Sequence, residues 1–440
     1  MSIRSALLLP LAACLIAVAC SGTVSTKPVD MEEDTEEPGE PGQQVFPSLL
    51  RAVHMGGNWG TNREVWTRWV DGGKAGPLIP PDYLSWLHSI HVDWVGISVA
   101  LHYDDSMDST VERVYLLADI IPTFTDEILR QIIRELRSGG IEVYLTLAFE
   151  AHAATTASRP VERWQLGLPR PPEGAAPEDW PWSPAHPDHQ RFVAEFWQTY
   201  TEQAVHFGKL AEEEGVKMYS LGTETDRLFR TRTGVHWPND FGDELKAMVA
   251  GVRAVYDGLL TYDMHYSVLQ YAEYFDGSTY LWEDLALDVV GISAYFELVD
   301  ELPDGVVSTE ILEQSYEDIF ARMLVPLARR NPTLPILFAE YGAVDVVSSP
   351  FDSGAESQGR PVVFVDRNGN DLDDGQETQA NMFQALFNVM DRHPGVLLGV
   401  FLWDNWMASD DLWAENYGSM RSFSIRDKLA EEVVREAYRP

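Results

Sequence analysis

The sequence predicts an α/β fold, a (β/α)8 TIM barrel formed by a single domain. Eight apolar, strand-like runs follow one another along the chain, and segments of helical length separate them. Several of these runs are apolar at consecutive positions, which is typical of strands covered on both faces. Such strands alternating with amphipathic helices predict a parallel sheet with helical crossovers.

The predicted strands comprise residues 52–56, 94–101, 142–149, 218–222, 258–265, 288–295, 336–340 and 397–403. A doubly wound open sheet is the alternative for this pattern. It is less favoured, because the Gly-rich phosphate loop that a nucleotide-binding open sheet usually requires does not follow the first run. The pattern therefore favours the closed barrel.

The predicted helices have recognisable ends. Thr125 precedes one helix as its N-cap, and Gly139 stops it. The apolar stripe of this helix consists of Ile128, Ile132, Ile133 and Leu136. A second helix is predicted over residues 190–214 and a third over residues 379–392. Each of the three leads directly into the next predicted strand.

The first 20 residues are typical of an export signal. Arg4 precedes an apolar run that is too short for a spanning helix, and small residues lead to Cys20. The residues before Cys20 resemble a bacterial lipoprotein cleavage box, with Cys14 as a second candidate. We expect a lipid anchor on Cys20; an ordinary secretory signal with an incidental cysteine is the alternative. The protein is then exported, either anchored at the cell surface or in the periplasm, or secreted.

Residues 21–45 form a second distinct segment, with seven acids against one lysine and several prolines and glycines. Such a segment repels itself and cannot build a core, so we expect a disordered tether. The folded domain is expected over residues 46–440.

The charge of the chain restricts its partners. With 69 acids against 32 bases, the net charge is -37, which argues against a nucleic-acid partner. It also disfavours an anionic membrane face or a polyanionic glycan, so we expect a neutral substrate and membrane contact only through the lipid anchor. We also expect a monomer.

Two of the predicted strands end in a glutamate. Glu340 ends the run PILFAEYG, and Glu224 ends the run MYSLGTE. In a (β/α)8 barrel the C-terminal strand ends share one rim, where catalytic groups lie. Glycoside hydrolysis needs such a pair of acids; a carboxyl separation of about 5 to 5.5 Å implies retention, and about 6.5 to 9.5 Å implies inversion.

The runs that carry these acids also carry a resemblance. SLGTE at residues 220–224, VGISAYFEL at 290–298, LFAEYG at 337–342 and FLWDNW at 401–406 are together similar to glycoside hydrolases of clan A. They resemble Glycoside Hydrolase Family 113 most closely, and the similarity extends over residues 53–438. The resemblance implies a (β/α)8 endo-β-1,4-mannanase that works with retention.

The resemblance also implies roles for residues at the rim. Glu224 corresponds to the general acid/base and Glu340 to the nucleophile, which we expect to stay ionised with the help of hydrogen bonds. Clan A usually has asparagine before the acid/base, whereas this chain has Thr223. The hydroxyl of Thr223 can still bind a sugar, but the usual amide contact to the 2-hydroxyl is in doubt.

Aromatic residues at the rim complete the predicted substrate site. The resemblance places Trp403 as a platform under the sugar next to the cleaved bond, and Tyr295 near the nucleophile. Further candidates for substrate contacts are His265, Trp59, Tyr341 and Trp406. Core packing is the alternative for each aromatic other than Trp403 and Tyr295. The sequence contains neither an HExxH motif nor a paired-cysteine motif, so a catalytic transition metal is not expected.

A second site is predicted in an insertion at about residues 350–377. The run DRNGNDLDDGQE matches a calcium loop, although Asp371 stands where the loop normally has glycine. The predicted ligands are Asp366, Asn368, Asn370, Leu372, Asp374 and Glu377. Calcium would clamp this loop structurally; a solvated acidic turn is the alternative.

The predicted function is hydrolysis of a neutral β-linked polysaccharide, with β-mannan as the first choice. Another clan A specificity, such as a β-galactanase or β-glucanase, is the alternative among enzymes. A surface glycan-binding lipoprotein that has lost turnover is the alternative of another class. The presence of both acids argues against it, because binding alone does not need them.

Overall fold

The computed structural model divides the chain into two units, residues 1–45 and residues 46–440. The first unit, which includes the predicted export signal, Cys20 and the acidic segment, lies outside the described residues. The structure describes residues 49–55, 65, 76–104, 108–115, 123–151, 163, 187–225, 242–270, 282, 285–352, 362–405, 407 and 421–440.

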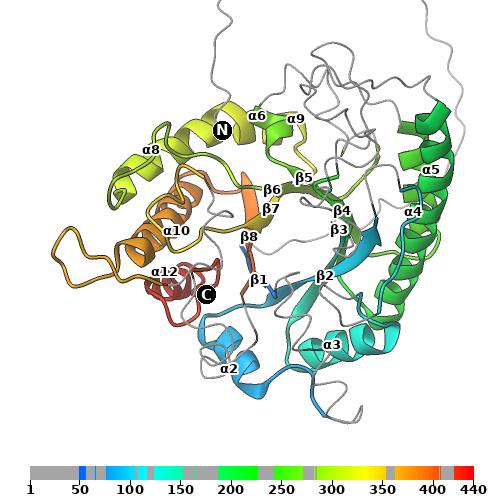
Figure 1. The fold of residues 1–440 in the computed structure, drawn as a ribbon, viewed down its shortest axis with the longest axis horizontal. Helices are drawn as coiled ribbons and strands as arrows, with labels where there is room; N and C mark the ends of the chain where they lie inside the picture. Colours follow the sequence, from blue (N-terminus) through cyan, green and yellow to red (C-terminus); the bar gives the residue numbers. More distant parts are fainter. Residues whose placement is uncertain are drawn as a thin grey trace, which may run out of the picture. The chain divides into compact units, whose positions relative to one another are not determined.

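The second unit is a closed barrel of eight parallel strands in the order β1 to β8 (Figure 1). The strands are β1 (Leu50–His54), β2 (Trp94–Tyr103), β3 (Glu142–Ala151), β4 (Met218–Thr223), β5 (Leu259–His265), β6 (Val290–Ser293), β7 (Ile336–Tyr341) and β8 (Leu397–Leu402). The barrel closes where β1 pairs with β8. The predicted fold is confirmed, and every predicted strand boundary lies within two residues of the observed one.

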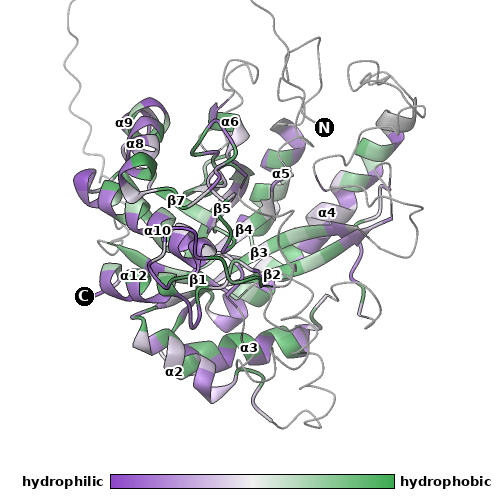
Figure 2. Ribbon diagram, turned by 60° about the vertical axis from the view of Figure 1, so that its left-hand side comes forward, coloured by the Kyte–Doolittle hydropathy of each residue, from purple (hydrophilic) through white to green (hydrophobic). Residues whose placement is uncertain are grey.

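Helices surround the barrel in Figure 1. They are α2 (Pro81–Ser89), α3 (Asp126–Ser138), α4 (Pro187–Glu214), α5 (Gly242–Arg253), α6 (Ser267–Gln270), α8 (Thr309–Ile319), η7 (Phe320–Leu324), α9 (Val325–Arg330), α10 (Asp374–Arg392) and α12 (Leu429–Ala437). The strands are mostly hydrophobic along their length, whereas the helices carry both hydrophobic and hydrophilic residues (Figure 2). Of the helices in the described ranges, none is long and apolar enough to cross a membrane.

The helix ends follow their local chemistry. Thr125 caps α3 as predicted, because its side chain accepts a hydrogen bond from the amide of Ile128. Helix α10 begins earlier than predicted, at Asp374 rather than near residue 379. The cause is Asp373, whose side chain accepts hydrogen bonds from the amides of Gly375 and Gln376 and so starts the helix.

The core has two layers separated by the sheet. The larger layer lies between the strands and the surrounding helices, and a smaller cluster fills the barrel interior. The interior cluster is formed by Leu50, Ala52, Tyr144, Met218, Val289, Leu337, Ala339, Leu398 and Phe401. Buried polar side chains also lie on the strands, including His54, Thr223, Asp263 and Glu340. Residues 52–54 and 337–340 therefore change from apolar to polar toward the C-terminal strand ends.

Both strands that end in a glutamate depart from regular pairing there. The register shifts between Ser220 and Thr223 on β4, and between Phe338 and Tyr341 on β7. On β7, Phe338 and Tyr341 belong to the outer core layer, whereas Ala339 belongs to the interior cluster. The irregularity breaks the alternation of side chains and lets Glu340 face the interior after Ala339.

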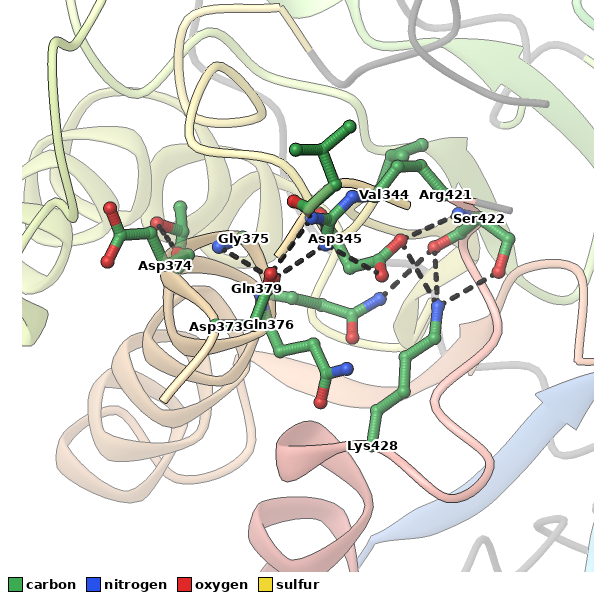
Figure 3. A network of polar contacts seen from close by, with 12 residues as sticks. Val344, Asp345, Asp373, Asp374, Gly375, Gln376, Gln379, Arg421, Ser422 and Lys428 are labelled. Carbon is green, nitrogen blue, oxygen red and sulfur yellow. Dashed lines mark hydrogen bonds and ion pairs between the residues drawn. The ribbon is translucent and has the colours of Figure 1, made fainter. Parts of the chain in front are cut away.

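A buried charge clamp of Asp345, Asp373, Arg421 and Lys428 fixes one side of the rim (Figure 3). Arg421 lies 2.6 Å from Asp373 Oδ1 and 3.3 Å from Asp345 Oδ2, and Lys428 Nζ lies 3.2 Å from Asp345 Oδ1. Burial alone would raise the pKa of Asp373, but the hydrogen bonds and charge of Arg421 hold it below its ordinary value. The clamp joins the segment after β7, the start of α10 and residues 421–428.

The pairing of the first and last strands, β1 and β8, is stabilised by contacts of Tyr438 near the C-terminal end of the chain. The hydroxyl of Tyr438 lies 3.1 Å from the carbonyl oxygen of Ala52 on β1 and 3.1 Å from that of Val400 on β8, and it donates its hydrogen bond to these carbonyls. Arg51 Nη1 in turn donates to the carbonyl of Tyr438 at 3.1 Å. The segment that follows α12 thus holds the barrel closed.

Candidate active site

Glu340 lies near the C-terminal end of β7 and is only 4% exposed. Tyr295, just beyond β6, donates its hydroxyl to Glu340 Oε2 at 3.3 Å. Glu340 Oε1 receives no hydrogen bond from the described residues. Burial raises the pKa of Glu340 well above its ordinary value, and the charges of Asp263 and Glu224 raise it further.

The expected help from a hydrogen bond is present at Glu340, but it does not set the direction of the pKa shift. A single hydrogen bond of 3.3 Å from Tyr295 and the charge of Arg163 lower its pKa, but burial and two acids outweigh them. Burial, followed by the charge of Glu340, also raises the pKa of Tyr295 well above its ordinary value. Tyr295 therefore keeps its proton and remains a hydrogen-bond donor to Glu340.

Glu224 follows β4 directly and is half-buried. Its φ is 52°, in the left-handed region that residues with a side chain seldom adopt. The conformation is held by a hydrogen bond of 2.9 Å from the amide of Glu224 to the carbonyl of Asp263 on β5. Strained backbone of this kind is frequent at functional sites. Here it turns the chain sharply after Thr223.

Arg163 brings a positive charge to these acids. Its Nη2 lies 3.5 Å from Oε1 of Glu150 on β3, and its side chain is 20% exposed. Burial disfavours the charged guanidinium, but the carboxylates of Glu150, Glu224 and Glu340 raise the pKa of Arg163 above its ordinary value. Arg163 thus offsets part of the negative charge that the glutamates bring together.

Trp403 follows β8 and is half-buried. Its ring centroid lies 4.6 Å from that of His54, the last residue of β1, at an interplanar angle of 45°. A Cβ at Gly96 would come within 2.4 Å of His54 Cδ2, so the close approach of this ring requires glycine. Burial lowers the pKa of His54 to about 3. His54 is therefore uncharged, and its ring packs against Trp403, the predicted sugar platform.

Thr223 and His265 lie at the same end of the barrel. Thr223 is fully buried, and its Oγ1 lies 2.8 Å from Oγ1 of Thr146 on β3. His265 is the last residue of β5, half-buried, with its Nδ1 2.8 Å from Oγ of Ser267. Thr223 directly precedes Glu224 on β4, and the strand order places β5, which carries His265, between β4 and β7.

Tyr341 does not fit the predicted groove contact. It is 2% exposed, its hydroxyl bonds with that of Tyr316 on α8, and its ring packs edge-on against Phe383 on α10 at 5.4 Å. The reason is the irregularity on β7, which turns Glu340 inward and Tyr341 toward the helices. The predicted contacts Trp59 and Trp406 lie outside the described residues.

The predicted calcium loop is held by its own hydrogen bonds. Asp366 Oδ1 accepts from the amides of Gly369 and Asn370, and Asp366 Oδ2 accepts from that of Asp371. Asp371, which replaces the expected glycine, has a φ of 65°, so it adopts the conformation for which glycine is favoured. The amide nitrogens of Asn368 and Asn370 both donate to Glu377 Oε2, and the Asp374 carboxylate accepts from the amide of Arg367. The described part of the chain contains no group of three or more His, Cys, Asp or Glu placed to hold a metal.

Sequence reasoning missed three residues of this site. Asp263 is the only acid inside the predicted strand 258–265, so the inward alternation of that strand offered a signal for it. His54 lies inside the predicted strand 52–56 and is the last residue of β1, so no positional signal in the sequence marked it. Arg163 comes from a long segment between β3 and α4, and no sequence pattern pointed to it.

Comparison with known proteins identifies the family of the chain. The profile of Glycoside Hydrolase Family 113 matches residues 183–428, which contain both glutamates, Tyr295 and Trp403. No curated protein sequence matches the chain.

Solved structures share the fold at low sequence identity. A GH113 β-1,4-mannanase in a complex structure is 17% identical with a TM-score of 0.58, covering 89% of this chain and 98% of its own. The GH113 β-mannanase AaManA from Alicyclobacillus acidocaldarius, in complex with ManMIm, is 17% identical with a TM-score of 0.57, covering 89% of this chain and 97% of its own. At these identities the likeness concerns the fold. The family match spans more than half of the chain, and the chain therefore belongs to Glycoside Hydrolase Family 113.

Proposed function

We propose that this glycoside hydrolase cleaves a neutral β-linked polysaccharide with retention of configuration, and that its substrate is β-1,4-mannan. The observation that carries the proposal is the placement of two carboxylates at irregular strand ends, with Glu224 directly after the irregularity of β4 and Glu340 within that of β7. The two similar solved structures described above are β-mannanases, which favours mannan over other glycans. The net charge of -37 favours a neutral glycan over an acidic one.

Hydrolysis then proceeds in two displacements. In the first, the ionised carboxylate of Glu340 attacks the anomeric carbon, the glycosidic C–O bond breaks, and Glu224 gives its proton to the leaving oxygen. In the second, Glu224 takes a proton from water as the water attacks the same carbon, and Glu340 leaves as a carboxylate. The guanidinium of Arg163 and the hydroxyl of Tyr295 favour the ionised form of Glu340 that starts the first step.

The roles of the two acids are separated by paired variants. Glu340→Ala is expected to abolish hydrolysis of manno-oligosaccharides and of activated aryl mannosides, because both need the nucleophile. Glu224→Ala is expected to spare the aryl substrates more, because a good leaving group needs less protonation. Full residual activity of folded Glu340→Ala contradicts the assignment.

Specificity and stereochemistry need separate measurements. Products of mannohexaose analysed by NMR within the first minutes should show the β-anomer; an initial α-anomer indicates inversion. A panel of mannan, galactan and β-glucan with reducing-sugar detection distinguishes a mannanase from the other clan A specificities. A folded protein that binds one of these glycans without releasing reducing ends would instead be a binding protein.

We also propose calcium at the loop of residues 366–377. The turns around Asp366 and the left-handed conformation of Gly369 and Asp371 support the proposal. Metal binding would require the carboxylate of Glu377 to exchange its contacts with Asn368 and Asn370 for the ion. Calorimetric titration of EDTA-treated protein with CaCl2 tests this, with MgCl2 as the control cation.

We propose, further, an exported monomer held at the membrane by a lipid on Cys20. Mass spectrometry of the N-terminal peptide of the mature protein distinguishes acylated Cys20 from a signal cleaved elsewhere. Fractionation of a Cys20→Ser variant tests the anchor, and light scattering tests the monomer.

A further inference from the structure

A third carboxylate lies beside the two proposed catalytic glutamates. Asp263 is a residue of β5, and its side chain is fully buried inside the barrel. Its Oδ2 accepts a hydrogen bond of 3.1 Å from the hydroxyl of Ser293 on β6. A buried carboxylate is costly unless something compensates it. The two-step hydrolysis described above needs only two acids.

The backbone places Asp263 between the glutamates. Its carbonyl accepts the amide of Glu224 at 2.9 Å, so Asp263 and Glu224 lie on adjacent strands. On the other side, Ser293 pairs in register with Glu340, and the amide of Ala294 donates to the carbonyl of Glu340 at 2.7 Å. Ser293 is thus the residue between the two acids. Asp263 on β5 and Glu340 on β7 are two strands apart, and neighbouring strands are about 4.8 Å apart.

The backbone contacts of Asp263 do not require its carboxylate. The amide of Asp263 donates to Ser220 and its carbonyl receives the amide of Glu224, and any residue would make both bonds. The side chain adds a negative charge two strands away from Glu340, which must itself be ionised to act as the nucleophile. That charge acts mainly on the ionisation of its neighbours.

We propose that Asp263 is a positioning residue of this active site: its buried carboxylate, oriented by Ser293, sets the lower pH limit at which Glu340 serves as nucleophile. The inference deepens the proposed retaining hydrolysis and rests on it for the role of Glu340. The coupling of the two carboxylates is a property of the fold and is measurable without substrate.

Other charged and titratable groups act on the same pair. Glu224 on the β4 side adds to the repulsion, whereas Arg163 after β3 and Tyr295 after β6 oppose it. After burial, the charge of Asp263 is the largest cause that raises the pKa of Glu340, and it also raises that of Tyr144 on β3. His54 on β1 is neutral because burial lowers its pKa to about 3. Removal of the Asp263 charge therefore makes Glu340 easier to ionise.

The first test uses no substrate. A buried acid with a raised pKa makes the fold less stable as pH rises from its unfolded value, about 4.3, toward its folded value. The fall in Tm between pH 5 and pH 8 should therefore be smaller in Asp263→Asn and in Glu340→Gln than in the parent. The double variant should show less than the sum of the two single effects. Additive effects mean that the carboxylates are not coupled and overturn the proposal.

The second test follows the acidic limb of kcat/KM for manno-oligosaccharides. In Asp263→Asn this limb should move to lower pH by about one unit or more. Ser293→Ala keeps the proposal testable if Asp263→Asn does not fold. Without the serine hydroxyl, the Asp263 carboxylate loses the contact that orients it, so the limb should also move in this variant, by less than in Asp263→Asn.

The outcomes of the second test are distinct. An unmoved acidic limb in folded Asp263→Asn, or loss of activity at every pH, overturns the role of Asp263. If the protein hydrolyses no glycan at all, the function proposed above fails, but the stability test still decides whether Asp263 and Glu340 are coupled.

Discussion

Replacement of Arg421 by methionine should destabilise the folded barrel measurably. The Arg421 side chain is 8% exposed and lies between Asp345 and Asp373, whose side chains are 1% and 5% exposed. Removal of one partner from a buried ion pair typically costs about 3 to 5 kcal/mol, because an uncompensated charge remains. Lys428 stays 3.2 Å from Asp345, and backbone amides still cap Asp373, so we expect the lower end, about 3 kcal/mol.

The expected change in Tm follows from the size of the domain. Residues 46–440 are 395 residues (440 − 45). At about 2.1 cal/mol/K per residue, the unfolding entropy is roughly 0.8 kcal/mol/K, so 3 kcal/mol lowers Tm by about 4 °C. The pKa of Asp373 is held low in the folded state, so its contribution is present above its unfolded pKa, about 3.9. This contribution is lost as pH falls through the pKa of Asp373 in the folded state. The Tm values of the parent and of Arg421→Met should therefore converge in acid.

The assay is thermal unfolding followed by circular dichroism at pH 7 and at pH 3. Arg322→Met is the matched control, because the Arg322 and Asp318 side chains are 70% and 58% exposed and such pairs contribute little. In the double variant, Asp373→Asn should restore part of the stability lost in Arg421→Met, because it removes the buried carboxylate that Arg421 no longer compensates. A Tm decrease below about 1 °C, or one equal to that of the control, refutes the reasoning.

Substitutions at three further positions test contacts near the C-terminal ends of the strands. Tyr295→Phe removes the hydrogen bond to Glu340 that lowers its pKa, so the acidic limb of kcat/KM should move to higher pH; a move to lower pH contradicts this sign. His54→Ala removes the ring that packs against Trp403, so KM should rise by a factor about tenfold larger than the factor by which kcat falls. His54→Phe keeps a ring there and should retain most of the substrate binding. An equal rise in KM in both variants argues against a role for the ring contact. Gly222→Ala would place a Cβ 2.5 Å from the hydroxyls of Tyr200 and Tyr262, so the yield of folded protein should drop sharply, and a normal Tm would show that β4 can move.

The barrel was predictable because its signals are local. Apolar runs, the Thr125 cap and glycines after helices report on a few neighbouring residues, and all eight strands were placed from them. Glu340 and Tyr295 were also found at strand ends, and the structure joins them by a hydrogen bond. The start of α10 was missed because the cap at Asp373 is fixed by Arg421, which is 48 residues away in sequence.

Features that depend on burial and on irregular pairing were not predictable. The outward direction of Tyr341 follows from a register shift on β7, which the sequence pattern does not reveal. The raised pKa of Glu340 depends on Asp263 and on the depth of burial, both of which need the closed barrel. Arg163 reaches the site from a segment without a periodic pattern, so only tertiary structure identified it.

The seam between β1 and β8 has a consequence for the order of folding during synthesis. Glu224 and Glu340 leave the ribosome before β8 and α12, but Trp403 reaches His54 only when β8 pairs with β1. That pairing is locked by Tyr438, so the substrate platform is assembled from the first strand and the last helical segment. A nascent chain therefore carries both glutamates while it still lacks the surface on which a sugar would rest. Catalytic competence should arise only when β8 pairs with β1 and closes the barrel.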